Sequence, residues 1–183
     1  MSNSYFEIAK SWFSPTPSPG YEFQNELEVS ELPGINKKYT DDKTLLYRAT
    51  TVDDVKKLLD NGINPNIVMR WASRNGNIEV VKFLVRQPGV DPGSQDNYAI
   101  KKASYYGDLE VVKFLVKQPG VDPSAQNNYA IKKASSGGHL EVVKILVKQP
   151  GVNPGFCNDA IRIASLYGNL KVVKFLESVG YIE

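Results

Sequence analysis

Basic residues recur at one position along the chain, and a tyrosine follows one of them at helical spacing. The basic residues are separated by 31, 31 and 30 positions and are Arg70, Lys101, Lys132 and Arg162. Tyr105 lies four residues after Lys101, and residues four apart in a helix share one side. If the helices that carry them stack side by side, the basic residues form a column that attracts acidic groups. The alternative is that these residues form an ordinary solvent-exposed face, whose charges keep the protein soluble and bind no partner.

Residue types that serve nucleophilic, acid–base or metal chemistry are scarce. His139 is the only histidine, and Asn or Asp stands at the equivalent position of related segments, which favours a helix-capping role. Cys157 is the only cysteine, and burial as a small apolar group is favoured for it. Each of several glutamates stands three residues before a lysine, a spacing that is typical of the solvent-exposed side of a helix. No phosphate-binding loop, metal-ligand spacing or nucleophile motif is present, so we expect no enzyme, no cofactor and no metal.

Composition narrows the classes of protein further. The chain has 183 residues, 42% of them hydrophobic and 23% charged, which fits one globular domain with a tail. No apolar run could cross a bilayer and no secretion signal is present, so we expect a cytoplasmic protein without a membrane partner. Residues 1–43 carry 4 Lys/Arg and 7 Asp/Glu, a charge of −3, and residues 44–183 carry 18 and 13, a charge of +5. This asymmetry is too mild for a dedicated nucleic-acid binder.

The elements that position these residues belong to an internal repeat. Residues 98–123 and 129–154 are identical at 21 of 26 positions by direct count. A preceding copy, a final copy and a shortened first copy extend the series. Five units therefore cover the chain after an acidic leader at 1–43, with approximate bounds of 44–66, 67–97, 98–128, 129–158 and 159–183.

Each unit reads as two short helices. In the third unit the first helix is expected over 99–106, where Gly107 ends it, because glycine tolerates a left-handed C-terminal conformation. The second helix is expected over 109–117, where Pro119 and Gly120 stop it. The second helix is apolar on most sides, so neighbouring units must cover it from both directions. The repeat therefore predicts an all-α solenoid of stacked helix pairs.

The recurring pattern A-x-x-x-G-[N/D/H]-L-E-V-V-K-F-L, followed by G-V-D-P, resembles the ankyrin repeat. The amino-acid sequence of the copies is also similar to repeat arrays of amoebae and of the large viruses that infect them. Two departures stand out. The family's T-P-L-H segment is here Tyr98-Ala-Ile-Lys101, and the loops carry an inserted Gln118-Pro119. These departures affect the expected shape of the loops but not the stack of helix pairs.

The resemblance implies a curved array that binds another protein on its concave face, through loop tips and the exposed side of the first helices. The loop-tip positions are Gln95, Asn97, Gln126 and Asn128. The first-helix positions that differ between otherwise similar copies are Arg74 and Asn75, Tyr105 and Tyr106, Ser136 and Gly137, and Leu166 and Tyr167. The predicted partner-binding set is Arg70, Arg74, Gln95, Asn97, Lys101, Tyr105, Tyr106, Gln126, Asn128, Lys132, Arg162 and Tyr167.

Several alternatives remain open at the level of sequence. The module could be an adaptor or scaffold for a protein partner, including an acidic one, with no small-molecule substrate. It could instead bind an anionic polymer such as RNA through the basic column, or serve as a viral structural or host-targeting protein. The leader holds an amphipathic stretch at 5–13 and a Pro-rich linker at 14–19, with Ser-Pro and Thr-Pro pairs open to modification. The amphipathic stretch either covers the first unit or docks on a partner.

Overall fold

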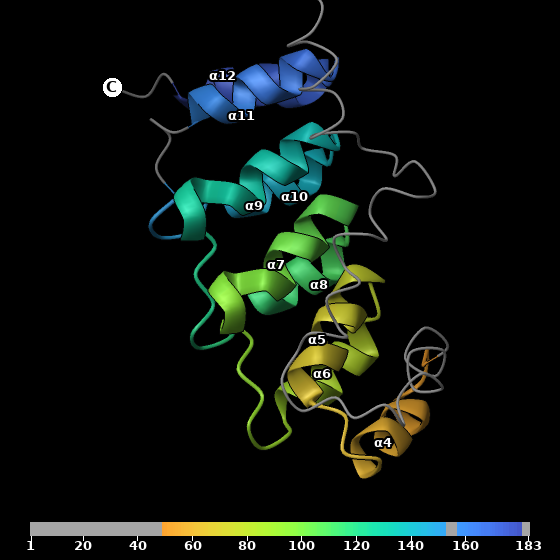
Figure 1. Ribbon diagram of the computed structural model, residues 1–183. Helices are drawn as coiled ribbons and strands as arrows, with labels where there is room; N and C mark the ends of the chain where they lie inside the picture. The colour runs from red at the N-terminus through yellow and green to blue at the C-terminus, as the bar shows by residue number, and fades with distance from the viewer. Residues whose placement is uncertain (1–48, 153–156, 181–183) are drawn as a thin grey trace, which may run out of the picture. The chain divides into compact units, whose positions relative to one another are not determined.

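The computed structural model describes residues 49–152 and 157–180, all within the unit Leu45–Glu183. In these ranges the regular secondary structure is α-helical (Figure 1), which confirms the predicted all-α class. The helices are α4 (Val52–Asp60), α5 (Pro65–Arg74), α6 (Ile78–Val85), α7 (Ser94–Tyr106), α8 (Leu109–Leu115), α9 (Ala125–Ser136), α10 (Leu140–Leu146), α11 (Cys157–Leu166) and α12 (Leu170–Gly180). The leader, with its predicted amphipathic and Pro-rich segments, lies outside the described residues, as does the side chain of Cys157.

The helices follow one another as antiparallel pairs, α5 with α6, α7 with α8, α9 with α10 and α11 with α12 (Figure 1). The first helices of successive pairs contact one another in the order α5, α7, α9 and α11. The second helices do the same in the order α6, α8, α10 and α12. Equivalent residues of the units therefore lie side by side, as the repeat predicts.

The core runs along the seam between the first and second helices. In the third unit Ile100 and Ala103 on α7 and Val112 and Leu115 on α8 are fully buried. The equivalent residues of the other units join them in one continuous cluster. Each buried aliphatic side chain contributes roughly 1.5–3 kcal/mol. Because each internal pair is covered by both of its neighbours, contacts between units stabilise the array together with those within each pair.

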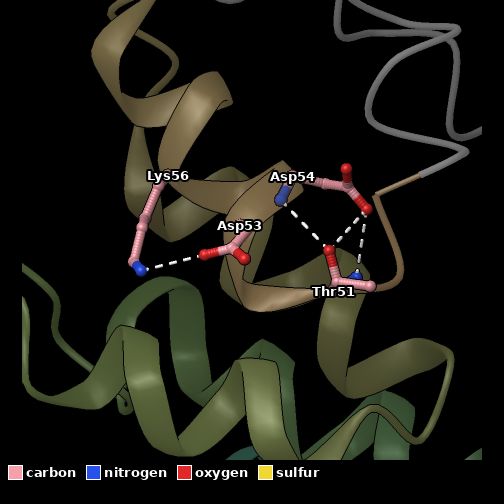
Figure 2. Close-up of polar contacts among 4 residues, drawn as sticks. All are labelled: Thr51, Asp53, Asp54 and Lys56. Atoms are coloured by element: carbon pink, nitrogen blue, oxygen red, sulfur yellow. Dashed lines mark hydrogen bonds and ion pairs between the residues drawn. The ribbon is translucent and has the colours of Figure 1, made fainter.

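Helix ends follow local chemistry at the start of α4 and the end of α7. Thr51 and Asp54 form a capping box, in which Asp54 N donates to Thr51 Oγ1 at 3.2 Å and Thr51 N donates to Asp54 Oδ2 at 3.3 Å (Figure 2). Lys56 pairs with Asp53 at 2.9 Å in the same helix. Gly107 adopts φ 79° and ends α7, as predicted. Helix α8 ends at Leu115, two residues before the predicted end.

The predicted capping role of His139 is wrong. Neither His139 nor the equivalent Asp108 makes a side-chain hydrogen bond to the helix that follows it. The imidazole points instead to the preceding pair, where His139 Nε2 lies 3.0 Å from the carbonyl oxygen of Tyr105. Asn77, at the same position of an earlier unit, does cap its helix, because its Oδ1 accepts from Val80 N at 3.3 Å.

A left-handed turn precedes the right-handed part of α7 and of α9. Gln95, Asp96 and Asn97 have φ of 51°, 54° and 63°, and 126–128 repeat this conformation. Asn97 N donates to Gly93 O at 3.0 Å, which closes the turn. Asparagine and aspartate tolerate the left-handed region better than most residues, so this turn replaces the proline helix start that the sequence lacks.

Candidate functional site

Three of the four residues of the basic column, Arg70, Lys101 and Lys132, contact the next unit, whereas Arg162 contacts Asp159 on its own helix. Arg70 on α5 donates from Nη1 to Gln95 Oε1 of the next pair. Lys101 on α7 donates from Nζ to Gln126 Oε1 at 2.9 Å. These contacts join a first helix to the left-handed turn of its neighbour. The predicted loop-tip glutamines therefore belong to the same surface as the column.

The column becomes more open toward the C-terminal end of the described residues. Lys132 Nζ lies 3.9 Å from Asp159 Oδ2, and its side chain is 21% exposed. Arg162 lies 3.6 Å from Asp159 Oδ1, and its side chain is 73% exposed. Asp159 thus takes the place that the glutamines hold in the earlier units, and it neutralises part of the charge at this end.

Two tyrosines that the sequence analysis did not select lie between the cations. The Tyr98 ring has the Arg70 guanidinium carbon 5.3 Å and the Lys102 Nζ 5.2 Å from its centroid. The Tyr129 ring, 37% exposed, has Lys101 Nζ at 5.6 Å and Lys133 Nζ at 5.2 Å. Each ring thus lies near one cation of the preceding unit and one on its own helix. Tyr98 and Tyr129 precede Lys102 and Lys133 by four residues, and this helical spacing is the sequence signal that could have predicted these contacts.

A second aromatic cluster continues the surface at the C-terminal ends of α5 and α7. The guanidinium carbon of Arg74 lies 5.5 Å from the Trp71 ring centroid and 5.3 Å from that of Tyr106. Tyr106 meets Tyr105 edge to face, with centroids 4.9 Å apart and planes at 81°. Lys133 Nζ lies 5.3 Å from the Tyr105 centroid. Cations and aromatic rings are therefore interleaved across α5, α7 and α9.

We call this set the basic–aromatic surface. Its members are Arg70, Trp71, Arg74, Tyr98, Lys101, Lys102, Tyr105, Tyr106, Tyr129, Lys132 and Lys133. Burial lowers the pKa of the Lys101 ammonium, Asp96 opposes this, and neighbouring Lys102 lowers the pKa further. Lys101 is thus partly desolvated among other cations, and a carboxylate brought to the surface would stabilise its charged form.

Two predicted loop-tip residues are not available to a partner. Asn97 and Asn128 are 7% and 3% exposed. Asn97 Oδ1 accepts from Asp122 N of the next loop at 2.6 Å, and Asn66 makes the equivalent contact to Asp91 N at 3.1 Å. The equivalent partner of Asn128 is residue 153, outside the described residues. These asparagines shape the array, so they are removed from the proposed surface.

The remaining predicted residue, Tyr167, is separate from this surface. Ser136, the last residue of α9, and Gly137 after it occupy the intervening positions, and Ser136 is buried with its Oγ donating to Lys133 O at 2.8 Å. The Tyr167 hydroxyl is buried without a hydrogen-bond partner among the described residues, and burial raises its pKa. The basic–aromatic surface therefore ends at α9.

The second helices of the pairs, α6, α8 and α10, carry separate ion pairs, as the sequence predicts. The pairs Glu79–Lys82, Glu110–Lys113 and Glu141–Lys144 measure 2.9, 2.6 and 2.7 Å, and their side chains are exposed. Within residues 49–152 and 157–180, no three His, Cys, Asp or Glu side chains come together in a way that could hold a metal ion. The helices in these ranges are also too short or too polar to span a bilayer.

Comparison with known proteins gives one family. The model for ankyrin repeats (3 copies) matches residues 47–127 and 97–181. No curated protein matches the chain.

Proposed function

The chain belongs to the ankyrin repeat family, and from this premise we propose that it is a non-catalytic module that binds an acidic segment of a partner protein on its basic–aromatic surface. Ankyrin repeats generally mediate protein–protein interaction. The single observation that carries the proposal is the interleaving of cations and aromatic rings on α5, α7 and α9. Gln95 and Gln126, which bridge neighbouring units, border this surface.

The chemistry of the surface favours carboxylates. Six cationic side chains gather on three adjacent helices, and the positive potential would speed association with an acidic segment. Tyrosine, tryptophan and arginine are also the residues that most often dominate binding energy. Their mutual contacts restrict the side chains before binding, which reduces the entropy lost when a partner arrives.

The same contacts argue against RNA as the ligand. Single-stranded nucleic acids bind by stacking bases on open aromatic faces. Here the Tyr98 and Tyr129 rings already have cations within 5.2 to 5.6 Å of their centroids, so a stacked base would have to displace them. Carboxylates need no such displacement, because they approach the cations directly.

A charge-reversal pair tests the proposal. The test variant combines Lys102→Glu and Lys133→Glu. The control combines Lys117→Glu and Lys148→Glu, which make the same charge change in the same two units at exposed positions beyond α8 and α10. Parent and control should capture the same acidic protein from a lysate, and the test variant should bind that purified protein at least about tenfold more weakly, equivalent to 1.4 kcal/mol.

Two outcomes would overturn the proposal. One is equal affinity of the folded test variant and the parent for the captured protein. The other is capture that ribonuclease abolishes and that weakens steeply with salt, since that pattern belongs to a polyanionic ligand. Circular dichroism of each variant verifies that its helices are intact.

A further inference from the structure

One position in each unit contacts the pair before it. The residues are Asn77, Asp108, His139 and Asn169, each one residue after the glycine that follows a first helix. Asn169 Nδ2 donates to the carbonyls of Ser135 and Ser136 at 2.9 and 2.8 Å. His139 Nε2 lies 3.0 Å from Tyr105 O, and Asn77 Nδ2 donates to Thr50 O at 2.5 Å. Three of the four residues thus meet a backbone carbonyl at the C-terminal end of the preceding first helix, or at its counterpart before α4.

Asp108 occupies this position with the same placement as Asn169. A Cβ atom on Gly76 would lie 3.0 Å from Asp108 Cγ and 3.6 Å from its Oδ2. A Cβ atom on Gly138 would lie 3.0 Å from Asn169 Cγ and 3.5 Å from its Nδ2. Asp108 Oδ2 therefore stands where Asn169 has its donor nitrogen. By repeat equivalence, the carbonyls that face it belong to Ser73 and Arg74.

This placement is unfavourable for a carboxylate. An ionised carboxylate only accepts hydrogen bonds, as a carbonyl does, whereas the protonated acid can donate one. Asp108 Oδ2 is buried and has no hydrogen-bond partner among the described residues. Its Oδ2 thus lacks the donor hydrogen that the equivalent residues bring to this junction.

We propose that Asp108 is a pH-dependent latch between the second and third units. Protonated, it donates its carboxyl hydrogen to the C-terminal carbonyls of α5. Ionised, it loses this hydrogen bond, and the junction between α5 and α7 is weakened. The latch is independent of what the basic–aromatic surface binds.

The electrostatic surroundings agree with this reading. The charged and titratable groups on the neighbouring elements are Arg70 and Arg74 on α5, Glu79 and Lys82 on α6, Asp96, Tyr98, Lys101, Lys102, Tyr105 and Tyr106 on α7, Glu110 and Lys113 on α8, and His139 before α10. The glutamates are paired with lysines, and Arg74 lies against Trp71 and Tyr106. Burial raises the pKa of the Asp108 carboxyl from 3.8 to about 6.

The sign of the pH effect follows. Because the pKa is raised in the folded state, the folded protein holds a proton that the unfolded chain releases between about pH 4 and pH 6. The latch therefore stabilises the fold at low pH, and this contribution is lost as pH rises to about 6. Burial lowers the pKa of His139, although the Tyr105 carbonyl opposes this. His139 therefore contributes with the opposite sign, and stability from it is lost as pH falls.

Asp108→Asn tests the latch, because the amide donates at every pH, as Asn169 does. The measurement is thermal unfolding in a His139→Asn background, which removes the opposing titration. At pH 7.5 we expect Asp108→Asn to raise the Tm by about 2–4 °C, the effect of one hydrogen bond in a chain of this size. At pH 4.5 the difference in Tm should fall below about 1 °C, because Asp108 of the His139→Asn background is then protonated and donates its own hydrogen bond.

The matched control is Asp96→Asn on α7, the helix that precedes Asp108. Asp96 is exposed and Asn127 stands at its equivalent position, so the charge change is the same without the buried junction. Its Tm difference should not vary between the two pH values. The proposal is overturned if Asp108→Asn is no more stable than its background at pH 7.5. It is equally overturned if the gain is the same at both pH values, because a permanent gain would not depend on protonation.

Discussion

Replacing Asn97 with alanine tests whether the loop-tip asparagines build the array or contact a partner. Asn97 is 7% exposed, and its Oδ1 accepts from Asp122 N at 2.6 Å, across the junction between the second and third units. Its φ of 63° lies in the left-handed region. Alanine would remove the hydrogen-bond acceptor. It would also adopt the left-handed backbone conformation less readily than asparagine does.

The expected loss has two parts. Leaving Asp122 N without its acceptor costs about 1–3 kcal/mol. Holding alanine rather than asparagine in the left-handed region adds about 1 kcal/mol. We therefore expect Asn97→Ala to lower the free energy of unfolding by about 2–4 kcal/mol, and Asn97→Gly to show only the first part, because glycine adopts this conformation freely.

Urea unfolding followed by circular dichroism measures these values. The control is Asn127→Ala, because Asn127 has the same backbone conformation, with φ of 55°, but is exposed. This control should lose only about 1 kcal/mol. The reasoning is refuted if Asn97→Ala and Asn127→Ala are equally stable, or if Asn97→Ala keeps full stability and loses partner binding instead.

Other variants test the core and the first helix. Leu115→Ala should lower the free energy of unfolding by about 2–5 kcal/mol in urea, because Leu115 is fully buried between units; a loss below 1 kcal/mol would contradict the packing. Thr51→Ala should cost about 1 kcal/mol and speed hydrogen exchange in α4. The Thr51 hydroxyl is the main cause that holds the pKa of Asp54 below 3.8, so an NMR titration of this variant should show that pKa rising toward 3.8. An unchanged titration would show that the capping box is not formed in solution.

The sequence predicts the helix pairs well because their signals are local. Glycine at position 107 and the apolar run of α8 act within a few residues, and both predictions agree with the structure. The contacts of the basic column were not predictable in this way. Lys101 meets Gln126, which is 25 residues away, and only the spacing of stacked units brings them together. Sequence patterns within one unit do not indicate which side chains contact a neighbouring unit.

The errors at His139 and at the loop-tip asparagines have a common cause. His139 was expected to cap its own helix, and Asn97 was expected to point outward. Both side chains instead make contacts with an adjacent unit. A polar residue at a helix end has two sets of backbone groups within reach, those of its own helix and those of a neighbour. Sequence within one unit reveals only the first set.

The near identity of the third and fourth units has a consequence for how such arrays change length. Ile100 and Ile131, or Leu115 and Leu146, present the same faces to whatever lies on either side. A duplicated 31-residue block would therefore find compatible neighbours wherever it was inserted in register. Residues outside this shared core can differ between blocks, as Tyr106 and Gly137 do, so the number of blocks and the pattern they display can vary independently.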